Sequence, residues 1–505
     1  MRHWFRLSLL ALPLSIALSS VTLAEAPPTA TKPKTPGKTE RLVDDETYEL
    51  YKIFAETMFQ VEQNYVKDIK RRELMEAAIR GVLEKLDPYS NYISPEEISR
   101  FKTSVESQFG GIGIQVTIEG GLLKVLSPLV GSPAYRAGIQ AGDAVVEING
   151  KSAQGISIDE AVKQLKGEPG TPVSVTILRD GSRQRQTMSL NREIIHVETV
   201  MGDRRKNDDS WDFMYDAEKK IGLIRITAFS RDTAEQVEQA VKQLKQQNLK
   251  GLVIDLRFNP GGLLKSATDI ADLFLTDGVI VTTRGRNTAP REVQARKSGT
   301  YEGFPIAVLV NRFSASASEI VSAALQDHER AVVIGERTWG KGSVQNVIDL
   351  EEGKSALKLT TASYWRPSGK NIHRFPDAKE TDEWGVLPNK GFELKLSDAE
   401  MGELVRVRRE RDMLLVSHAP AAVSARQKND PTKSTDEKPK ADASKNDQES
   451  KKSDAPKDKK DDAKAKDATG DNAKVAEPAK DNKPFVDRQL QKALDYLTTE
   501  LAKAQ

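Results

Sequence analysis

The chain has 505 residues, which is more than a single domain normally contains. Its 76 basic and 74 acidic residues leave a formal net charge of +2, so no overall field favours nucleic acid or a membrane surface. The absence of cysteine excludes disulfides, thiolate catalysis and cysteine-ligated zinc. We expect no metal or other cofactor, because no ligand-like spacing links the histidines, which are His3, His196, His328, His373 and His418.

Residues 1–24 have the pattern of an export signal. Arg2 and Arg6 precede an apolar run from Leu7 to Leu18, and the small-residue stretch "TLA" follows before Glu25. The apolar run is too short for an ordinary membrane span, although an uncleaved anchor is an alternative. We therefore expect export to a bacterial periplasm. Residues 25–44, rich in Pro, Thr and Lys at their start, predict a flexible leader.

Residues 45–101 predict an N-terminal helical region. The stretches "TYELYKIFAETMFQVEQNYV" (47–66) and "RRELMEAAIRGVLEKL" (71–86) repeat apolar residues every three or four positions. Such a pair of amphipathic helices packs either on its own domain or as an arm on a second copy of the chain. The sequence leaves both open.

Residues 102–190 are rich in predicted strands and contain the glycine-rich stretch "FGGIGIQV" (109–116). Glycines allow consecutive backbone amides to converge on one point, which suits a carboxylate, although such stretches also form simple turns. With the segments "SPAYRAGIQAGD" and "VVEINGK" and the helical run 158–166, this region resembles a PDZ domain. PDZ domains bind an extended C-terminal peptide as an added strand.

The resemblance implies a peptide-binding site in this region. The terminal carboxylate would be bound by the amides of Ile112, Gly113 and Ile114. The pocket for the last side chain of the peptide would be lined by Ile112, Ile114, Val162 and Leu165.

Residues 191–415 alternate strands and helices, with near-continuous apolar strands such as "KGLVIDLRF" (250–258) and "PIAVLVN" (305–311). This pattern favours an α/β layer covered on both faces. Residues 416–483 contain almost no large apolar residue and predict a disordered charged linker. Residues 484–505 predict an amphipathic helix with an apolar stripe at Val486, Leu490, Leu494, Leu497 and Leu501. Its docking partner, the rest of this chain or another subunit, stays open.

The stretch "NRFSASASEI" (311–320) offers three candidate nucleophiles, Ser314, Ser316 and Ser318, and a serine nucleophile needs a base. Asp327 and His328 suggest a Ser-His-Asp triad. If residues 316–328 form one helix, however, the serine and the histidine are roughly 18 Å apart. We therefore interpret His328 as a helix-end residue.

Lys341, in "GERTWGKGSVQ" (335–345), is the better candidate base. It must be neutral, so its pKa must fall well below about 10.4, and burial near Trp339 and Val344 is expected to lower it. If residues 341–345 are extended, Gln345 lies on the same face as Lys341 and can hold the amine.

Residues 308–345 closely resemble the catalytic region of the carboxyl-terminal processing proteases, serine endopeptidases with a Ser–Lys dyad and a preceding PDZ domain. The resemblance implies that Ser316 is the nucleophile, Lys341 the base and Gln345 its support. A second family signature, "DLRFNPGGLL" (255–264), implies an oxyanion hole formed by the amide of Gly261 or Gly262 with that of Ala317; a tight strand–helix turn is the alternative.

The sequence thus predicts an α+β multidomain protein, an exported serine endopeptidase that cleaves protein substrates with exposed C-termini through an acyl-enzyme. The helices predicted at both ends suggest a homo-oligomer, and an adaptor protein that delivers substrate is compatible with the architecture. The alternative is a non-catalytic scaffold or chaperone that binds C-termini. The presence of Ser316, Lys341 and Gln345 together disfavours it.

Overall fold

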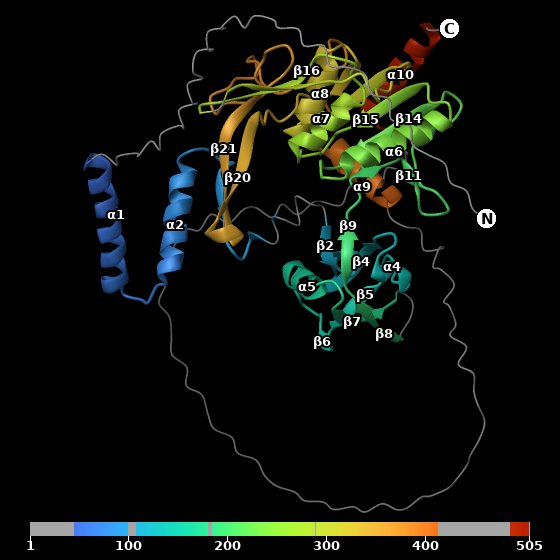
Figure 1. Cartoon of the computed structure of the whole chain (residues 1–505). Coiled ribbons are helices and arrows are strands. Elements are labelled where there is room, and N and C mark those ends of the chain that lie inside the picture. The colour runs from blue at the N-terminus through green and yellow to red at the C-terminus, as the bar shows by residue number, and fades with distance from the viewer. Residues whose placement is uncertain are drawn as a thin grey trace, which may run out of the picture. The chain divides into compact units, whose positions relative to one another are not determined.

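The computed structural model describes residues 45–98, 101, 108–179, 184–287, 289–412 and 485–503 (Figure 1). The predicted signal peptide 1–24, leader 25–44 and charged linker 416–483 lie outside the described residues. The described chain divides into two compact units, one ending at Met75 and the other beginning at Glu76. None of the described helices is long and apolar enough to span a bilayer.

Two helices near the N-terminus confirm the predicted helical region. They are α1 (Asp45–Asn64) and α2 (Arg71–Glu84). Within the first unit, the Arg71 guanidinium binds the Glu62 carboxylate through two hydrogen bonds of 2.5 and 2.7 Å, which ties the end of α1 to the start of α2. Several aromatic side chains of α1 are exposed, among them Tyr51 at 65% and Phe59 at 55%.

The predicted PDZ domain is a sheet with strand order β3-β4-β5-β7-β8, in which β6 pairs with β5. Its strands are β3 (Ile114–Glu119), β4 (Leu122–Pro128), β5 (Ala144–Ile148), β6 (Lys151–Ser152), β7 (Pro172–Leu178) and β8 (Arg185–Asn191). Its helices are α4 (Pro133–Arg136) and α5 (Ile158–Leu165). A two-stranded ribbon, β2 (Gln108–Gly111) with β9 (Glu193–His196), joins the residues that enter and leave the domain.

The centre of the predicted protease core, residues 191–415, is a parallel sheet. Its four parallel strands are β14 (Ile221–Ile226), β15 (Gly251–Asp255), β18 (Ile306–Val310) and β19 (Ala331–Gly335). Two antiparallel strands, β10 (Val200–Met201) and β13 (Met214–Asp216), pair with β14. The short hairpin of β11 (Arg204–Arg205) and β12 (Trp211–Asp212) lies between them in sequence.

Helices cover both faces of this sheet, as the apolar strands predicted. One face packs against α6 (Thr233–Gln246), α7 (Leu264–Asp272) and α8 (Ala317–Asp327). The other face packs against the final helix, α10 (Arg488–Lys503). Successive strand residues alternate between the two layers, so Leu252 and Ile254 contact the α6–α8 side while Val253 contacts the α10 side.

A second sheet is built around a long hairpin that is prominent in Figure 1. The hairpin consists of β20 (Ser343–Leu350) and β21 (Ser355–Trp365), joined by the 3₁₀ turn η1 (Glu351–Gly353). Further strands pair with it or extend it: β1 (Asn91–Ile93), β16 (Val279–Gly285) and β17 (Arg291–Gln294). Helix α9 (Asp398–Asp412) follows the core.

The final helix docks on the protease core of its own chain, which answers the question that the sequence left open. Leu490, Ala493 and Leu497 are buried against the sheet, and Leu494 and Leu501 are partly buried there. Val486, which we predicted to belong to the same stripe, precedes the helix and is 62% exposed. The predicted stripe is therefore right for the helix itself and wrong at its first residue.

Candidate active site

Ser316 lies at the end of the turn between β18 and α8 and is the N-cap residue of that helix. Its backbone has φ +55° and ψ −110°, a conformation that is strained for any residue except glycine. Such strain costs on the order of 1–3 kcal/mol and persists where the surrounding structure imposes it, most often at functional sites. Ser316 is 8% exposed, so its side chain lies in a nearly closed site.

The two flanking serines hold the turn in place. The Ser314 hydroxyl donates to the carbonyl of Leu256 at 2.9 Å and accepts from the amide of Asn311 at 2.9 Å. The Ser318 hydroxyl donates to the carbonyl of Asn259 at 2.9 Å. The cap position of α8 belongs to Ser316, while Ser314 and Ser318 fasten the turn to the segment that follows β15.

Lys341 is brought to Ser316 by a residue that we did not select from the sequence, Glu319. One oxygen of its carboxylate accepts from the amide of Ser316 at 2.7 Å and from the amide of Lys341 at 2.8 Å. The two amide nitrogens can therefore be no farther apart than the sum of these distances. The spacing S-x-x-E, typical of a capping box, is the sequence signal that identifies Glu319.

The Lys341 amine lies 5.0 Å from the centre of the Tyr89 ring, in the segment before β1. Trp339, which we expected to bury it, is 50% exposed, and its indole NH donates to the Tyr89 hydroxyl at 3.5 Å. Burial lowers the pKa of Lys341 from its usual 10.5, the positive charge of Lys358 lowers it further, and the negative charge of Glu319 opposes both. The environment thus favours the neutral amine that a base requires.

The side chain of Gln345 lies beside that of Ser343 on β20. Its side-chain amide donates to the Ser343 hydroxyl at 2.8 Å and to the Thr360 hydroxyl at 3.3 Å. Thr360 in turn donates to the carboxylate of Asp87 at 3.2 Å. Gln345 is thus fixed beside the lysine loop, and its contact with the amine itself stays a prediction.

The turn at Gly261 and Gly262 packs against the nucleophile. A Cβ atom on Gly261 would lie 2.8 Å from the Cβ of Ser316, and its φ of +102° also requires glycine. The Gly261 amide donates to the side chain of Asn259 at 2.8 Å. Within the described residues, the amides of Gly262 and Ala317 have no acceptor, which makes them the available pair of donors.

His328 caps the C-terminal end of α8, at the opposite end of the helix from Ser316. Its Nε2 lies 2.8 Å from the carbonyl oxygen of Val279. The neighbouring carboxylate of Asp327 pairs with Arg366 at 2.5 Å. The arrangement matches our interpretation of His328 as a helix-end residue and separates it from the nucleophile.

Behind the glycine turn lies a buried ionic network that reaches the final helix. The Arg257 guanidinium pairs with Asp255 at 2.8 Å and with Asp487 at 2.7 Å, and it also donates to Gln489 at 3.0 Å. Arg408 of α9 pairs with Asp255 as well. Although burial opposes it, the two arginines hold the pKa of the Asp255 carboxyl well below its usual range. The network thus links the end of β15 to the final helix.

In the PDZ domain, the carbonyls of Ile112 and Gly113 accept from the amides of Ala134 and Leu129, respectively. Their own amides have no acceptor within the described residues. Gly113 has φ +73°, and a Cβ there would lie 2.3 Å from the Cβ of Ser132. The loop therefore needs glycine and leaves two amides available to a ligand, as a carboxylate-binding loop does.

The other predicted pocket residues differ in exposure. Ile112 and Leu165 are buried within the PDZ core, whereas Ile114 and Val162 are partly exposed. β3 is an edge strand of its sheet, so a peptide can be added beside it.

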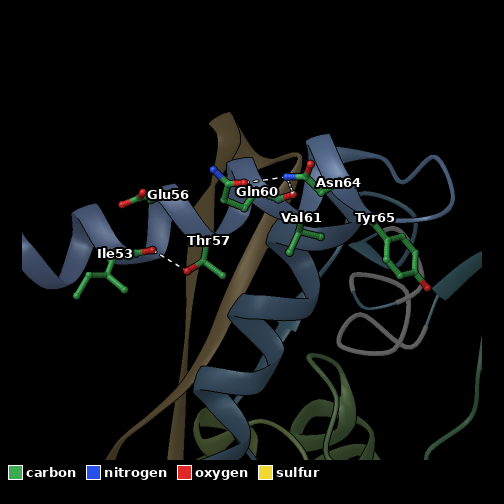
Figure 2. Close-up of a pocket in the computed structure, with 7 residues that line it drawn as sticks. All are labelled: Ile53, Glu56, Thr57, Gln60, Val61, Asn64 and Tyr65. Atoms are coloured by element: carbon green, nitrogen blue, oxygen red, sulfur yellow. Dashed lines mark hydrogen bonds between the residues drawn. The ribbon is translucent and has the colours of Figure 1, made fainter.

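The chain also has a shallow hollow along α1, within the first unit. Figure 2 shows it lined by Ile53, Glu56, Thr57, Gln60, Val61, Asn64 and Tyr65. The Thr57 hydroxyl donates to the Ile53 carbonyl, and the Asn64 amide donates to Gln60. No group of metal-ligating side chains was found within the part of the chain that the structure describes.

Comparison with known proteins identifies the family. The model of peptidase family S41 matches residues 220–380, that of the PDZ domain matches 124–179, and that of the activating protease CtpB N-terminal domain matches 20–97. The molecule is therefore a serine-type peptidase that carries a PDZ domain.

Among curated proteins, the carboxy-terminal-processing protease of Bartonella bacilliformis is 39% identical over 377 residues, 73% of this chain and 83% of that protein. CtpA of Bacillus subtilis, a carboxy-terminal processing protease, is 34% identical over 69% of this chain and 73% of its own length. The chain belongs to the carboxy-terminal processing proteases. A solved structure, the photosystem II D1 C-terminal processing protease, is 27% identical, covers 71% of this chain and 96% of its own, and has a TM-score of 0.38.

Proposed function

We propose that this protease cleaves polypeptides with a Ser316–Lys341 dyad through an acyl-enzyme. The observation that carries the proposal is the strained backbone of Ser316, whose amide donates to the same oxygen of the Glu319 carboxylate as the amide of Lys341. A non-catalytic scaffold would have no use for this strain, which disfavours that alternative.

The reaction begins when the neutral Lys341 amine takes the proton of the Ser316 hydroxyl as its oxygen attacks the scissile carbonyl. The amides of Gly262 and Ala317 donate to the oxyanion that forms. Lys341 then gives its proton to the leaving amine, and the acyl group remains on Ser316. A water molecule, deprotonated by Lys341, attacks the acyl-enzyme, releases the new carboxyl terminus and restores the serine.

We propose that the PDZ domain binds the C-terminal carboxylate of the substrate. The available amides of Ile112 and Gly113 support this, with the amide of Ile114 at the start of the edge strand β3 as the third donor. The peptide backbone extends β3, and its last side chain contacts Ile114 and Val162. One of the similar solved structures, a PDZ domain of a carboxy-terminal protease from Vibrio cholerae, is described as a complex with peptide.

The protein acts as an exported homo-oligomer in this proposal. The basic and apolar pattern of residues 1–24 supports export to the periplasm, and the exposed aromatic residues of α1 support association with a second copy. An adaptor protein that delivers the substrate is part of the same proposal. Cell fractionation and light scattering of the purified chain, with and without candidate partners, test these points.

The central test measures degradation of an unstructured protein with an apolar C-terminus by the wild type, Ser316→Ala and Lys341→Ala. Both variants should lose cleavage by at least about 10³-fold, because residues of a catalytic unit fail together. A single-turnover assay with an activated ester should trap an acyl group on Ser316 only in the wild type. Cleavage that survives Ser316→Ala would refute the dyad.

A further inference from the structure

A single buried carboxylate joins the two proposed catalytic segments, which are also linked by a hydrogen bond from the Trp339 amide to the Ser314 carbonyl at 3.0 Å. Glu319, which is fully buried, accepts from the amide of Ser316 at 2.7 Å and from the amide of Lys341 at 2.8 Å on one oxygen. Its other oxygen accepts from the amide of Gly340 at 2.6 Å and from the hydroxyl of Thr338 at 2.5 Å. Two donors thus reach each oxygen.

A third segment of the chain joins at the same point. The Thr338 hydroxyl, which donates to Glu319, accepts from the amide of Val386 at 2.7 Å. A Cβ atom on the neighbouring Gly385 would lie 2.9 Å from the Thr338 hydroxyl and 3.4 Å from the Glu319 carboxylate. The turn before α8, the loop before β20 and the segment at residues 385–386 therefore converge on Glu319.

Only the ionised carboxylate satisfies these contacts. It presents about four acceptor positions, and four donors point at them. A protonated carboxyl or a glutamine amide would direct its own hydrogens at one or two of these donors. Burial raises the pKa of Glu319 to about 7, and the hydrogen bonds from Thr338, Gly340, Ser316 and Lys341 oppose that rise.

We propose that Glu319 is a positioning residue for the dyad: its carboxylate fixes the amides of Ser316 and Lys341 at one point and so sets the separation of the serine hydroxyl from the lysine amine. The proposal rests on the proposed Ser–Lys mechanism. It is not an electrostatic activation of the base, because the negative charge of Glu319 raises the pKa of Lys341 and disfavours the neutral amine. The other groups near this amine are Lys358 of β21, whose charge lowers its pKa, and the ring of Tyr89.

Glu319→Gln tests the proposal, and Glu336→Gln is its matched control. Glu336 is also a buried glutamate, it follows β19, and it pairs with Arg312 at 3.2 Å. Hydrogen–deuterium exchange should show faster exchange at the amides of Gly340 and Lys341 in Glu319→Gln, and wild-type exchange there in Glu336→Gln. This measurement needs no turnover, so it is independent of the proposed mechanism.

The kinetic arm measures kcat and KM across pH. In Glu319→Gln, kcat should fall by at least about tenfold with KM unchanged, since a misplaced dyad loses rate rather than binding. The acid limb of kcat should move to lower pH, because removal of the negative charge lowers the pKa of Lys341. A merely destabilised protein would show neither the unchanged KM nor this shift. Thr338→Val, which removes one donor and keeps the carboxylate, should lose less rate.

The outcomes are distinguishable. Unchanged exchange at Gly340 and Lys341 in both Glu319→Gln and Thr338→Val overturns the proposal, whatever the chemistry of the enzyme. Faster exchange with wild-type kcat also overturns it, because the fixed amides would then have no effect on the reaction. If Lys341→Ala retains activity while Glu319→Gln shows faster hydrogen exchange at the amides of Gly340 and Lys341, the Ser–Lys mechanism fails and the structural link through Glu319 stands.

Discussion

Replacement of Leu497 by alanine should destabilise the protease core, because α10 is an integral layer of that core. Leu497 is fully buried, and its side-chain carbons lie about 3.5 Å from the position that a Cβ on Gly251 of β15 would occupy. Leucine-to-alanine changes at such positions cost about 2–5 kcal/mol in free energy of unfolding. Because only one face of α10 is covered, the helix can partly collapse into the space that the smaller side chain leaves. We therefore expect a loss of unfolding free energy near the lower end of this range, at about 2–3 kcal/mol.

Urea unfolding followed by tryptophan fluorescence measures this loss. Beyond the predicted signal peptide, all tryptophans lie in the protease core and none in the PDZ domain: Trp211, Trp339, Trp365 and Trp384. The fluorescence transition therefore reports the core. In Leu497→Ala, the urea concentration at the midpoint of unfolding should fall, while the dependence of the unfolding free energy on urea concentration stays unchanged.

Val486→Ala is the matched control for this experiment. Val486 precedes α10 in the same segment and is 62% exposed, so its replacement should change the unfolding free energy by less than about 0.5 kcal/mol. Equal midpoints for Leu497→Ala and Val486→Ala would show that α10 does not dock on the sheet, and would refute this description of the core.

Three further predictions concern the active site. Gly261→Ala should reduce kcat on the order of a hundredfold, because the new Cβ would lie 2.8 Å from the Cβ of Ser316; wild-type kinetics would contradict the packing. Since burial lowers the pKa of Lys341 and the base must be neutral, kcat/KM should rise with pH and level off below pH 10.5, and a pH–rate profile with a limb at or above that value would disprove a neutral, buried base. His328→Ala should keep kcat within about twofold of the wild type in the degradation of an unstructured protein with an apolar C-terminus, because its ring lies at the far end of α8 against Val279; a loss of about 10³-fold would favour a Ser-His-Asp triad instead.

Local patterns predicted the helices and strands of the fold well, because the spacing of apolar residues depends on whether the segment is a helix or a strand. The apolar stretches 250–258 and 305–311 became β15 and β18, and alternate residues face opposite helical layers. The helices near the N-terminus followed from their apolar spacing in the same way. A pattern of this kind does not name the surface that an amphipathic helix will cover, so the docking of α10 had to come from the structure.

The candidate site was only partly predictable for a similar reason. Ser316 and Lys341 are set in distinctive short motifs, and a motif is local in sequence. The surroundings of the lysine amine are not local in sequence: Tyr89 reaches it from a segment about 250 residues earlier, and Trp339 donates to the hydroxyl of the same tyrosine. Glu319 carried a local signal, and its second set of partners, at residues 338–341, depended on tertiary structure.

The docking of α10 has a consequence for when this protease is completed. The residues that cover the second face of the sheet, and the Asp487 and Gln489 side chains that hold Arg257, follow the other described elements of the core in the chain and are therefore synthesised after them. Residues 413–484 separate them from α9, so every other layer of the core is made well before them. A nascent or truncated chain that ends before α10 leaves the apolar face of β14, β15, β18 and β19 uncovered and Arg257 without two of its partners. The order of synthesis thus gives the cell an interval in which the catalytic residues exist but the core that supports them is unfinished.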